Sequence, residues 1–299
     1  MRKLKISAIS FLNTAPLMWD FEHAGVTAGA ELSAGAPSLA QPRVGLQDFD
    51  IHYTVPSQCA DELKAGTSDI GIIPVAAYAS IPGLVILPDV AIAAQHAVKS
   101  IVLVSRVPLD QIKTVAADTS SRTSVALLHV LFSRFWGGDR QFTPMGPKLE
   151  DMLAACDAAL LIGDAALVVD RSKYLTWDLA EEWRNCTGKP FVFAFWAVRL
   201  AALNEMRRGL DLGEAFKTSR DHGLDPANVA QIAREWGPKL GLSESHVISY
   251  LTESIDYDLS PQNREGLELF YQYAAECGAI PEIPTLRFLG VSALIEAMR

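Results

Sequence analysis

Short apolar runs alternate with amphipathic segments along the first two-thirds of the chain. The apolar runs predict strands over residues 5–9, 50–55, 70–73, 84–87, 100–105, 114–117, 158–162 and 191–197. Helical periodicity between these runs predicts helices over residues 15–22, 57–65, 125–135, 149–154 and 177–185. Strands that alternate with helices in this way are typical of an α/β fold.

The pattern changes at residue 200, after which helical periodicity dominates. Helices are predicted near residues 203–221, 226–240, 243–257, 261–277 and 291–298. Residues 24–45 are rich in Ala, Gly and Ser and predict an irregular excursion. We therefore expect an α/β body followed by a helical C-terminal region.

Two predicted strands, 100–105 and 191–197, do not fit a simple strand-helix-strand rhythm. They would serve well as crossovers between two lobes. We therefore predict that residues 1–99 and 197–299 form lobe one, and that residues 100–196 form lobe two.

A ligand cleft is expected between these lobes. Small ligands of α/β proteins bind in interdomain clefts and at the carboxyl ends of parallel strands. Residues 10–14, Ser100 and residues 119–124 each lie at a predicted strand end or crossover. We expect them to face one concavity.

Composition restricts the possible partners. The chain has 299 residues, of which 49% are hydrophobic and 20% charged, as in an ordinary folded protein of one large or two medium domains. Its net charge of -9, without any Lys/Arg run longer than two residues, argues against nucleic acid and anionic membranes as partners. No stretch approaches the roughly 20 apolar residues of a membrane span. The N-terminus lacks the pattern of a secretory signal, so we expect a cytoplasmic protein.

Several familiar kinds of site lack their sequence signature. The chain has no GxSxG, HExxH, GxxxxGK[ST] or strand-linked GxGxxG motif, which removes the main support for serine hydrolase, zincin, P-loop and Rossmann interpretations. The four cysteines form no CxxC pair, and the six histidines show no metal-ligand spacing. We therefore expect no metal site.

A hydroxyl-rich turn stands between the strand predicted over residues 114–117 and the next helix. It contains the residues Thr119, Ser120, Ser121, Arg122, Thr123 and Ser124. Backbone N–H groups at a helix start have no partner within the helix, so a carboxylate could bind there together with the hydroxyls and the guanidinium. The alternative is an ordinary cluster of N-cap residues that binds nothing.

A second polar turn follows the first predicted strand. It offers Ser10, Asn13 and Thr14 as neutral hydrogen-bonding groups, and Pro16 suits the first turn of the following helix. A capped strand-to-helix junction without a ligand explains the same residues equally well.

Asp164 follows an apolar run directly after Gly163, which permits close backbone approach. This carboxylate could orient Arg122 or a neighbouring hydroxyl. Alternatively, it could cap the next helix.

Four segments together resemble the chorismate dehydratases of the futalosine route to menaquinone. They are Ser10-Phe11-Leu12-Asn13-Thr14-Ala15-Pro16-Leu17, Lys99-Ser100-Ile101-Val102-Leu103-Val104-Ser105, Asp118-Thr119-Ser120-Ser121-Arg122-Thr123-Ser124-Val125-Ala126-Leu127 and Ile162-Gly163-Asp164-Ala165-Ala166-Leu167. The resemblance covers most of residues 1–200 and implies the two-lobed fold of type II periplasmic binding proteins. Residues 24–45 depart from it, because they are longer than the compact connection expected there.

The resemblance also implies an activity. Such enzymes convert chorismate to 3-[(1-carboxyvinyl)oxy]benzoate without a metal or an organic cofactor. By motif, Asn13 and Ser100 correspond to the polar pair near the reacting ring, and Ser121, Arg122 and Thr123 to carboxylate-holding groups. We expect Ser10, Thr14, Thr119, Ser120 and Asp164 to complete the substrate site.

The expected chemistry leaves the base to be identified. Loss of the C4 hydroxyl and the C3 hydrogen makes the ring aromatic, so the enzyme needs to orient the substrate and stabilise developing charge. The motifs contain no histidine and one carboxylate, Asp164. We therefore hypothesise that a carboxylate of the substrate removes the C3 proton.

Two alternative functions stay open at this point. A 1,4-dihydroxy-6-naphthoate synthase of the same pathway shares the fold and a hydroxyl-rich cleft, although the Ser-Ser-Arg-Thr-Ser run favours the dehydratase. A non-catalytic module that binds a small carboxylate is the other alternative. The sequence does not predict the oligomeric state.

Overall fold

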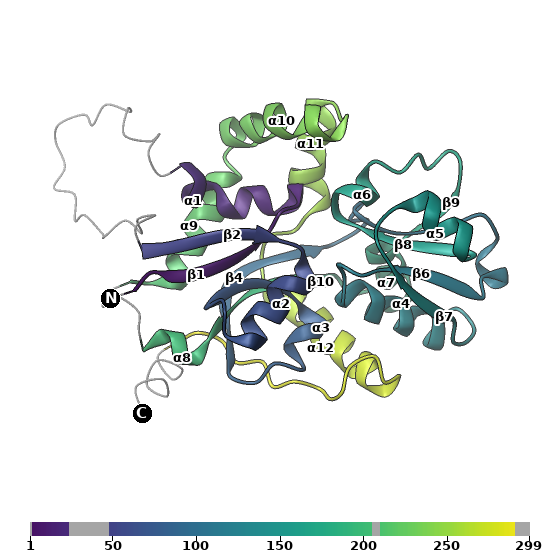
Figure 1. The fold of residues 1–299 in the computed structure, drawn as a ribbon, viewed down its shortest axis with the longest axis horizontal. Coiled ribbons are helices and arrows are strands. Elements are labelled where there is room, and N and C mark those ends of the chain that lie inside the picture. Colours follow the sequence, from purple (N-terminus) through teal and green to yellow (C-terminus); the bar gives the residue numbers. More distant parts are fainter. Residues whose placement is uncertain (1, 24–47, 205–209, 291–299) are drawn as a thin grey trace.

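The computed structural model describes residues 2–23, 48–204 and 210–290 and contains two five-stranded sheets. The sheets lie one after the other along the long axis of the molecule, each with helices packed on it (Figure 1). The predicted irregular excursion over residues 24–45 and the predicted helix over residues 291–298 lie outside the described residues.

The first sheet has the strand order β2-β1-β3-β10-β4. Its strands are β1 (Leu4–Ile9), β2 (Phe49–Thr54), β3 (Ile70–Pro74), β4 (Leu84–Ala94) and β10 (Phe191–Arg199). β1 pairs in parallel with β2 and β3, whereas β10 runs antiparallel between β3 and β4. All residues of β3 and all but the last of β10 are buried, because helices cover both faces of these nearly continuous apolar runs.

The second sheet has the strand order β7-β6-β8-β5-β9. Its strands are β5 (Ile101–Ser105), β6 (Thr114–Asp118), β7 (Gln141–Met145), β8 (Ala158–Ile162) and β9 (Leu175–Asp178). β6 pairs in parallel with β7 and β8, and β5 runs antiparallel to β8 and β9. The edge strands β7 and β9 were not predicted, because they are largely exposed and lack the apolar pattern of the central strands.

Helices connect the strands of both sheets. They are the 3₁₀ helix η1 (Leu12–Met18), α1 (Trp19–His23), α2 (Pro56–Ala65), α3 (Val75–Tyr78), the 3₁₀ turn η4 (Leu109–Gln111), α4 (Thr123–Arg134), α5 (Leu149–Ala155), α6 (Gly163–Leu167) and α7 (Leu179–Thr187). Residues 177 and 178, predicted to begin a helix, belong to β9 instead. Asp178 ends that strand and accepts the N–H groups of Ala180 and Glu181, so α7 begins after it.

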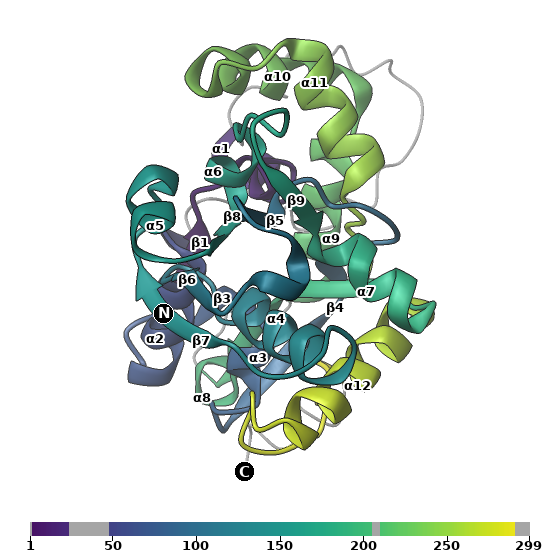
Figure 2. The same ribbon diagram turned by 90° about the vertical axis from the view of Figure 1, so that its right-hand side faces the viewer.

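The chain crosses between the sheets over residues 95–100 and 188–190, that is, before the strands β5 and β10 and not within them. β5 pairs with β8 and β9, and β10 pairs with β3 and β4, so each strand belongs to one sheet. The predicted lobe boundary between residues 196 and 197 thus falls inside β10. We propose instead that the described residues among 2–99 and 191–290 form lobe one; Figure 2 shows lobe two in front of it.

The C-terminal region is helical, as predicted, with α8 (Leu200–Leu203), α9 (Leu212–Gly223), α10 (Pro226–Leu240), α11 (Glu244–Ser249) and α12 (Pro261–Glu276). The helix predicted from residue 203 starts later, where Asp211 accepts the N–H of Glu214 and caps α9. In none of the ranges that the structure describes is a helix long and apolar enough to cross a membrane.

The prediction of a single helix over residues 243–257 is wrong for the second half of that range. A π-helical turn, η5 (Tyr250–Ser254), follows α11, and Ile255 is extended. Asp256 and Ala93 then exchange two backbone hydrogen bonds of 2.8 Å, which draw the chain onto the end of β4. These bonds to the first sheet stop the helix.

Candidate functional site

The candidate site lies where the two sheets face each other at the ends of their strands. We call these strand ends the facing edges. β1, β2 and β3 of lobe one end at this edge, and so do β6 and β8 of lobe two. Three hydrogen bonds with a backbone donor cross between the lobes here: Ser57 N–H to the Ser120 carbonyl (3.0 Å), Ala76 N–H to Thr123 Oγ1 (3.2 Å) and Leu12 N–H to Asp164 Oδ1 (3.0 Å). The predicted segments thus face one another between the lobes.

Asn13, Ser100, Asp164 and Tyr250 gather at the centre of this region. Asn13 lies in η1 after β1, and its Oδ1 accepts a hydrogen bond from Thr14 Oγ1 (3.3 Å). Ser100 is fully buried just before β5, where its carbonyl accepts the N–H of Gly163 (2.8 Å). The Tyr250 hydroxyl lies close enough to Ser100 and Asn13 for both side chains to affect its pKa. The sequence predicted the first three of these residues.

Tyr250 is the member of this cluster that sequence reasoning missed. It is buried at the start of the π-helical turn η5, in the C-terminal region. Burial raises the pKa of its hydroxyl well above the ordinary value, and the charge of Asp164 raises that pKa further. Turns of π-helix occur often at functional sites, but a sequence pattern does not reveal them in advance.

Asp164 lies in the first turn of α6 and is half-buried. Burial raises the pKa of its carboxyl to about 6, and the hydrogen bond from the Leu12 N–H opposes this shift. The sequence left open an interaction with Arg122 and a role in capping the next helix. The structure shows neither among the described contacts: Asp164 binds the first turn of lobe one instead.

The hydroxyl-rich turn leads into α4, which begins at Thr123. Ser121 Oγ accepts the N–H of Ser124 (3.1 Å) and thereby acts as the helix cap that the alternative interpretation expected. Ser120 donates to the buried carboxylate of Asp118 (2.6 Å). Because Thr123 bonds across to Ala76, these three hydroxyls all have partners within the protein.

Arg122 points to lobe one. Its guanidinium forms an ion pair with Asp61 of α2, with Nη2 2.7 Å from Oδ1. The two side chains are 36% and 51% exposed, so solvent weakens this pair. A substrate carboxylate could therefore compete with Asp61 for the guanidinium.

Ser10 and Thr119, two further predicted site residues, are exposed. The hydroxyl and the N–H of Ser10 both donate to the Thr54 carbonyl, and the N–H of Thr119 donates to the Met145 carbonyl. Both residues lie at the rim of the facing edges, whereas Thr14 is buried beside Asn13.

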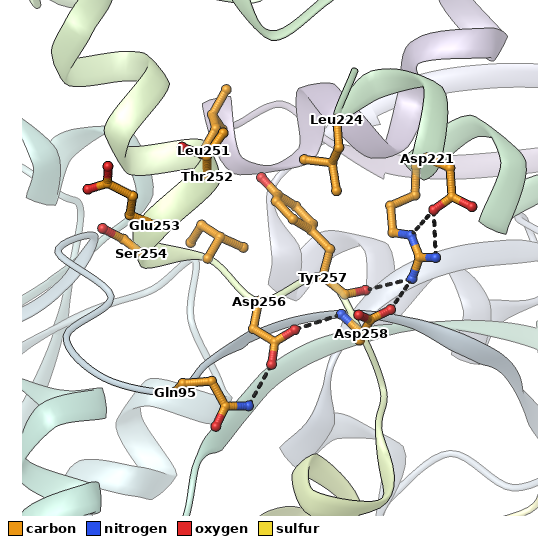
Figure 3. A pocket seen from close by; sticks show the side chains of 12 residues that line it. Gln95, Asp221, Leu224, Leu251, Thr252, Glu253, Ser254, Asp256, Tyr257 and Asp258 are labelled. Atoms are coloured by element: carbon orange, nitrogen blue, oxygen red, sulfur yellow. Dashed lines mark hydrogen bonds and ion pairs between the residues drawn. The ribbon is translucent and has the colours of Figure 1, made fainter. Parts of the chain in front are cut away.

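Two cavities adjoin this region. One, of about 560 Å³, has walls from α3, α4 and the chain after α12, and Ser121, Arg122 and His129 line it. The other, of about 510 Å³, lies between α9, η5 and the end of β4 (Figure 3). There Arg220 binds Asp258 and Asp221, and Gln95 binds Asp256.

Metal-ligating side chains do not gather at the site. Within residues 2–23, 48–204 and 210–290, no group of three or more His, Cys, Asp or Glu could hold a metal ion. His129, the histidine nearest the hydroxyl-rich turn in sequence, stacks on Phe142 with ring centroids 3.9 Å apart, and burial lowers its pKa. The central cluster of Asn13, Ser100, Asp164 and Tyr250 therefore offers neutral polar groups and one carboxylate.

Comparison with solved structures identifies the fold. The chain is similar to protein AF1704 from Archaeoglobus fulgidus, with a TM-score of 0.66, 15% identity and coverage of 93% of this chain and 98% of that one. It is similar also to the periplasmic aliphatic sulphonate binding protein SsuA from Escherichia coli, with a TM-score of 0.63, 17% identity and coverage of 97% and 94%. The predicted two-lobed, periplasmic-binding-protein-like α/β fold is confirmed.

Comparison of sequences identifies the family. A chorismate dehydratase from Thermus thermophilus is 29% identical over 259 residues, which are 80% of this chain and 90% of that protein. The pattern of the family described as menaquinone biosynthesis matches residues 4–276, nearly the whole length. The chain belongs to this menaquinone biosynthesis family.

Proposed function

We propose that the protein is a chorismate dehydratase, a carbon-oxygen lyase that forms 3-[(1-carboxyvinyl)oxy]benzoate for menaquinone biosynthesis. The observation that carries this proposal is the similarity to the Thermus thermophilus chorismate dehydratase over most of both chains. The proposal includes action in the cytoplasm, with chorismate as the small-molecule partner and no cofactor.

The geometry supports this function because the reaction needs orientation more than an added reagent. The product ring is aromatic, so the driving force lies in the product. In our proposal Asn13 and Ser100 flank the reacting ring, and their buried polar groups stabilise the leaving C4 oxygen. A carboxylate of the substrate removes the C3 proton, as Asp164 is already bonded to Leu12.

Recognition of the dianionic substrate falls to the start of α4 and its surroundings. Arg122 and the hydroxyls of Ser121 and Thr123 stand there, next to backbone N–H groups of the first helical turn. Charge-assisted hydrogen bonds contribute about 1.5–3 kcal/mol each. Three or four of them would account for the roughly 8 kcal/mol of a micromolar complex.

The test is to incubate purified protein with chorismate and follow the products by liquid chromatography and mass spectrometry. We expect an aromatic product lighter by one water, formed catalytically, absent without protein and unaffected by a chelator. An Asn13→Ala variant should lose this activity, whereas Asn185→Ala, on the exposed side of α7, should keep it. Unchanged chorismate with folded protein would contradict the proposal and favour the naphthoate synthase or a binding module.

A further inference from the structure

Two hydroxyls at the candidate site have no hydrogen-bond partner of regular geometry among the described residues. They are Ser100 Oγ and the Tyr250 hydroxyl, and both atoms are completely buried. Buried polar groups in native proteins almost always have partners, so each exception needs an explanation. Function explains this pair if the two hydroxyls bond to each other and to the reacting group once the substrate is bound.

The chain places Tyr250 at this position with an unusual local structure. α11 ends at Ser249, and the π-helical turn that begins at Tyr250 carries the chain down to β4, where Ala93 and Asp256 bond to each other. Figure 1 shows the segment after α11 running down towards the first sheet. The π-helical turn begins at this residue, and turns of this kind occur often at functional sites.

We propose that Tyr250 is a positioning residue of the reaction centre, whose hydroxyl donates to Ser100 Oγ and so directs the Ser100 O–H at the leaving C4 oxygen of the substrate. This inference rests on the proposed function. A serine hydroxyl accepts hydrogen bonds and donates one. If Ser100 Oγ accepts from Tyr250, the Ser100 proton is left to donate to the substrate. The side chain of Asn13 also lies close enough to the Tyr250 hydroxyl to lower its pKa.

The role requires a hydroxyl that keeps its proton. Burial and the nearby carboxylate of Asp164 raise the pKa of Tyr250 far above neutral pH, so it acts as a donor throughout the working range. In the reaction the electron pair of the C3–H bond forms the C3–C4 double bond, and the C4–O pair leaves with oxygen. The proton from C3 passes through the substrate carboxylate to that oxygen, and water departs. Tyr250 and Ser100 are unchanged.

The test is a double-mutant cycle of Tyr250→Phe and Ser100→Ala, with kcat and KM for chorismate measured in each variant. Phe keeps the ring and removes a buried hydroxyl that makes no hydrogen bond of regular geometry with the described residues, so the variant should fold with a Tm close to that of wild type. We expect kcat to fall on the order of 100-fold with KM within about threefold, as for the loss of one donor to a developing oxyanion. In the Ser100→Ala background, Tyr250→Phe should lower kcat by less than about threefold, because the group through which it acts is gone.

Tyr78→Phe is the matched control. Tyr78 is another buried tyrosine, but its hydroxyl accepts the N–H of Arg287 and contacts the Thr285 carbonyl, away from the facing edges. The Tyr78→Phe substitution should change kcat by less than about twofold, both in the wild-type protein and in the Ser100→Ala variant. Unchanged kcat in Tyr250→Phe, or equal losses with and without Ser100, would overturn the inference while leaving the proposed function intact. A wild-type protein that does not consume chorismate would overturn both.

Discussion

The backbone N–H of Leu12, in lobe one, donates to the carboxylate of Asp164, in lobe two, across 3.0 Å. This bond joins the turn that carries Asn13 to the turn after β8. Phe11 reinforces the contact, because its ring packs directly on Gly163. The turn with Asn13 and the Gly163-Asp164 pair, which the sequence singled out separately, therefore form one unit, and its geometry depends on how the lobes meet.

Substitution of Asp164 by Asn separates two possible proton acceptors. Asn can still accept the Leu12 N–H through its amide oxygen, so the contact between the lobes should remain. If a substrate carboxylate removes the C3 proton, we expect kcat to fall by no more than about tenfold, the effect of a weaker hydrogen bond. Steady-state kinetics with chorismate measures this.

A near-complete loss of turnover in Asp164→Asn, with product binding and Tm preserved, would instead identify Asp164 as the base. Its pKa of about 6 would suit that role at neutral pH. Asp164→Glu then serves as a second variant, since a displaced carboxylate should recover part of the activity of a true base.

Asp164 should also make stability depend on pH in a defined direction. The carboxyl has a pKa of about 6 in the folded protein and about 3.9 in the unfolded chain. Its stabilising contribution is therefore fully present below pH ~4 and is lost as the pH rises through ~6. We expect Asp164→Asn to gain up to about 3 kcal/mol in the free energy of unfolding relative to wild type between pH 4 and pH 7. Urea unfolding at both pH values measures the difference.

Asp170→Asn is the control for this comparison. Hydrogen bonds from Ser172 and Lys173 lower the pKa of the exposed Asp170 to about 2, so it is ionised in both the folded protein and the unfolded chain above about pH 5. The difference in free energy of unfolding between Asp170→Asn and wild type should be constant from pH 5 to pH 7. A constant difference for Asp164→Asn as well would mean that Asp164 titrates normally in the folded protein.

The central strands of both sheets were predictable because burial on two faces demands apolar residues. β3 and β8 are examples: every residue of each is buried, and each appeared as an uninterrupted apolar run. β7 was missed because an edge strand needs no such run, and Pro144 within it argues against a strand by local rules. Pairing with β6 makes this segment a strand, although its own sequence does not favour one.

The site was predictable where it lies at the ends of those strands. Asn13 and Asp164 follow predicted strands and Ser100 begins one, and sheet topology brings such positions together. Tyr250 was not predictable, because it reaches the site through a π-helical turn and a backbone bridge that join segments more than a hundred residues apart. The partner of Arg122 was missed for a similar reason: Asp61 lies on a helix of the opposite lobe.

Arg122 is expected to contribute to substrate binding more than to the chemical step. Removing a charged donor to a carboxylate costs about 1.5–3 kcal/mol, so Arg122→Ala should raise KM for chorismate roughly 10-fold to 150-fold with a smaller effect on kcat. Asp61→Asn should leave KM the same or lower, because it removes the competing carboxylate. An exposed ion pair contributes little to stability, so the Tm of the Asp61→Asn variant should differ from that of wild type by no more than a few degrees.

Arg134→Ala controls for the loss of an arginine elsewhere on α4. Arg134 pairs with Glu276 and lies over the Tyr273 ring, at the far end of that helix. The KM of the Arg134→Ala variant for chorismate should equal that of wild type. If Arg122→Ala behaves in the same way, Arg122 serves to join the lobes through Asp61 and does not hold the substrate.

Gly163 should tolerate no side chain. Its φ of +59° is a left-handed conformation, and a Cβ atom built there would stand 2.6–2.9 Å from three carbons of the Phe11 ring. Strain and overpacking together predict that Gly163→Ala lowers the free energy of unfolding by about 2–4 kcal/mol. Turnover should fall as well, because a displaced Phe11 moves the turn that carries Asn13. Urea unfolding and the chorismate assay measure the two effects.

Gly188→Ala isolates the backbone contribution to that loss. Gly188 ends α7 with a φ of +73°, and nothing lies within 4 Å of a Cβ atom there. It should lose only about 1–2 kcal/mol and keep full turnover. Replacing Phe11 by Leu in the Gly163→Ala protein relieves the clash, so it should recover the stability difference between the two glycine variants. Equal losses for Gly163→Ala and Gly188→Ala, with no gain from Phe11→Leu, would show that the contact across the lobes adjusts freely, and Asn13 would then not depend on it.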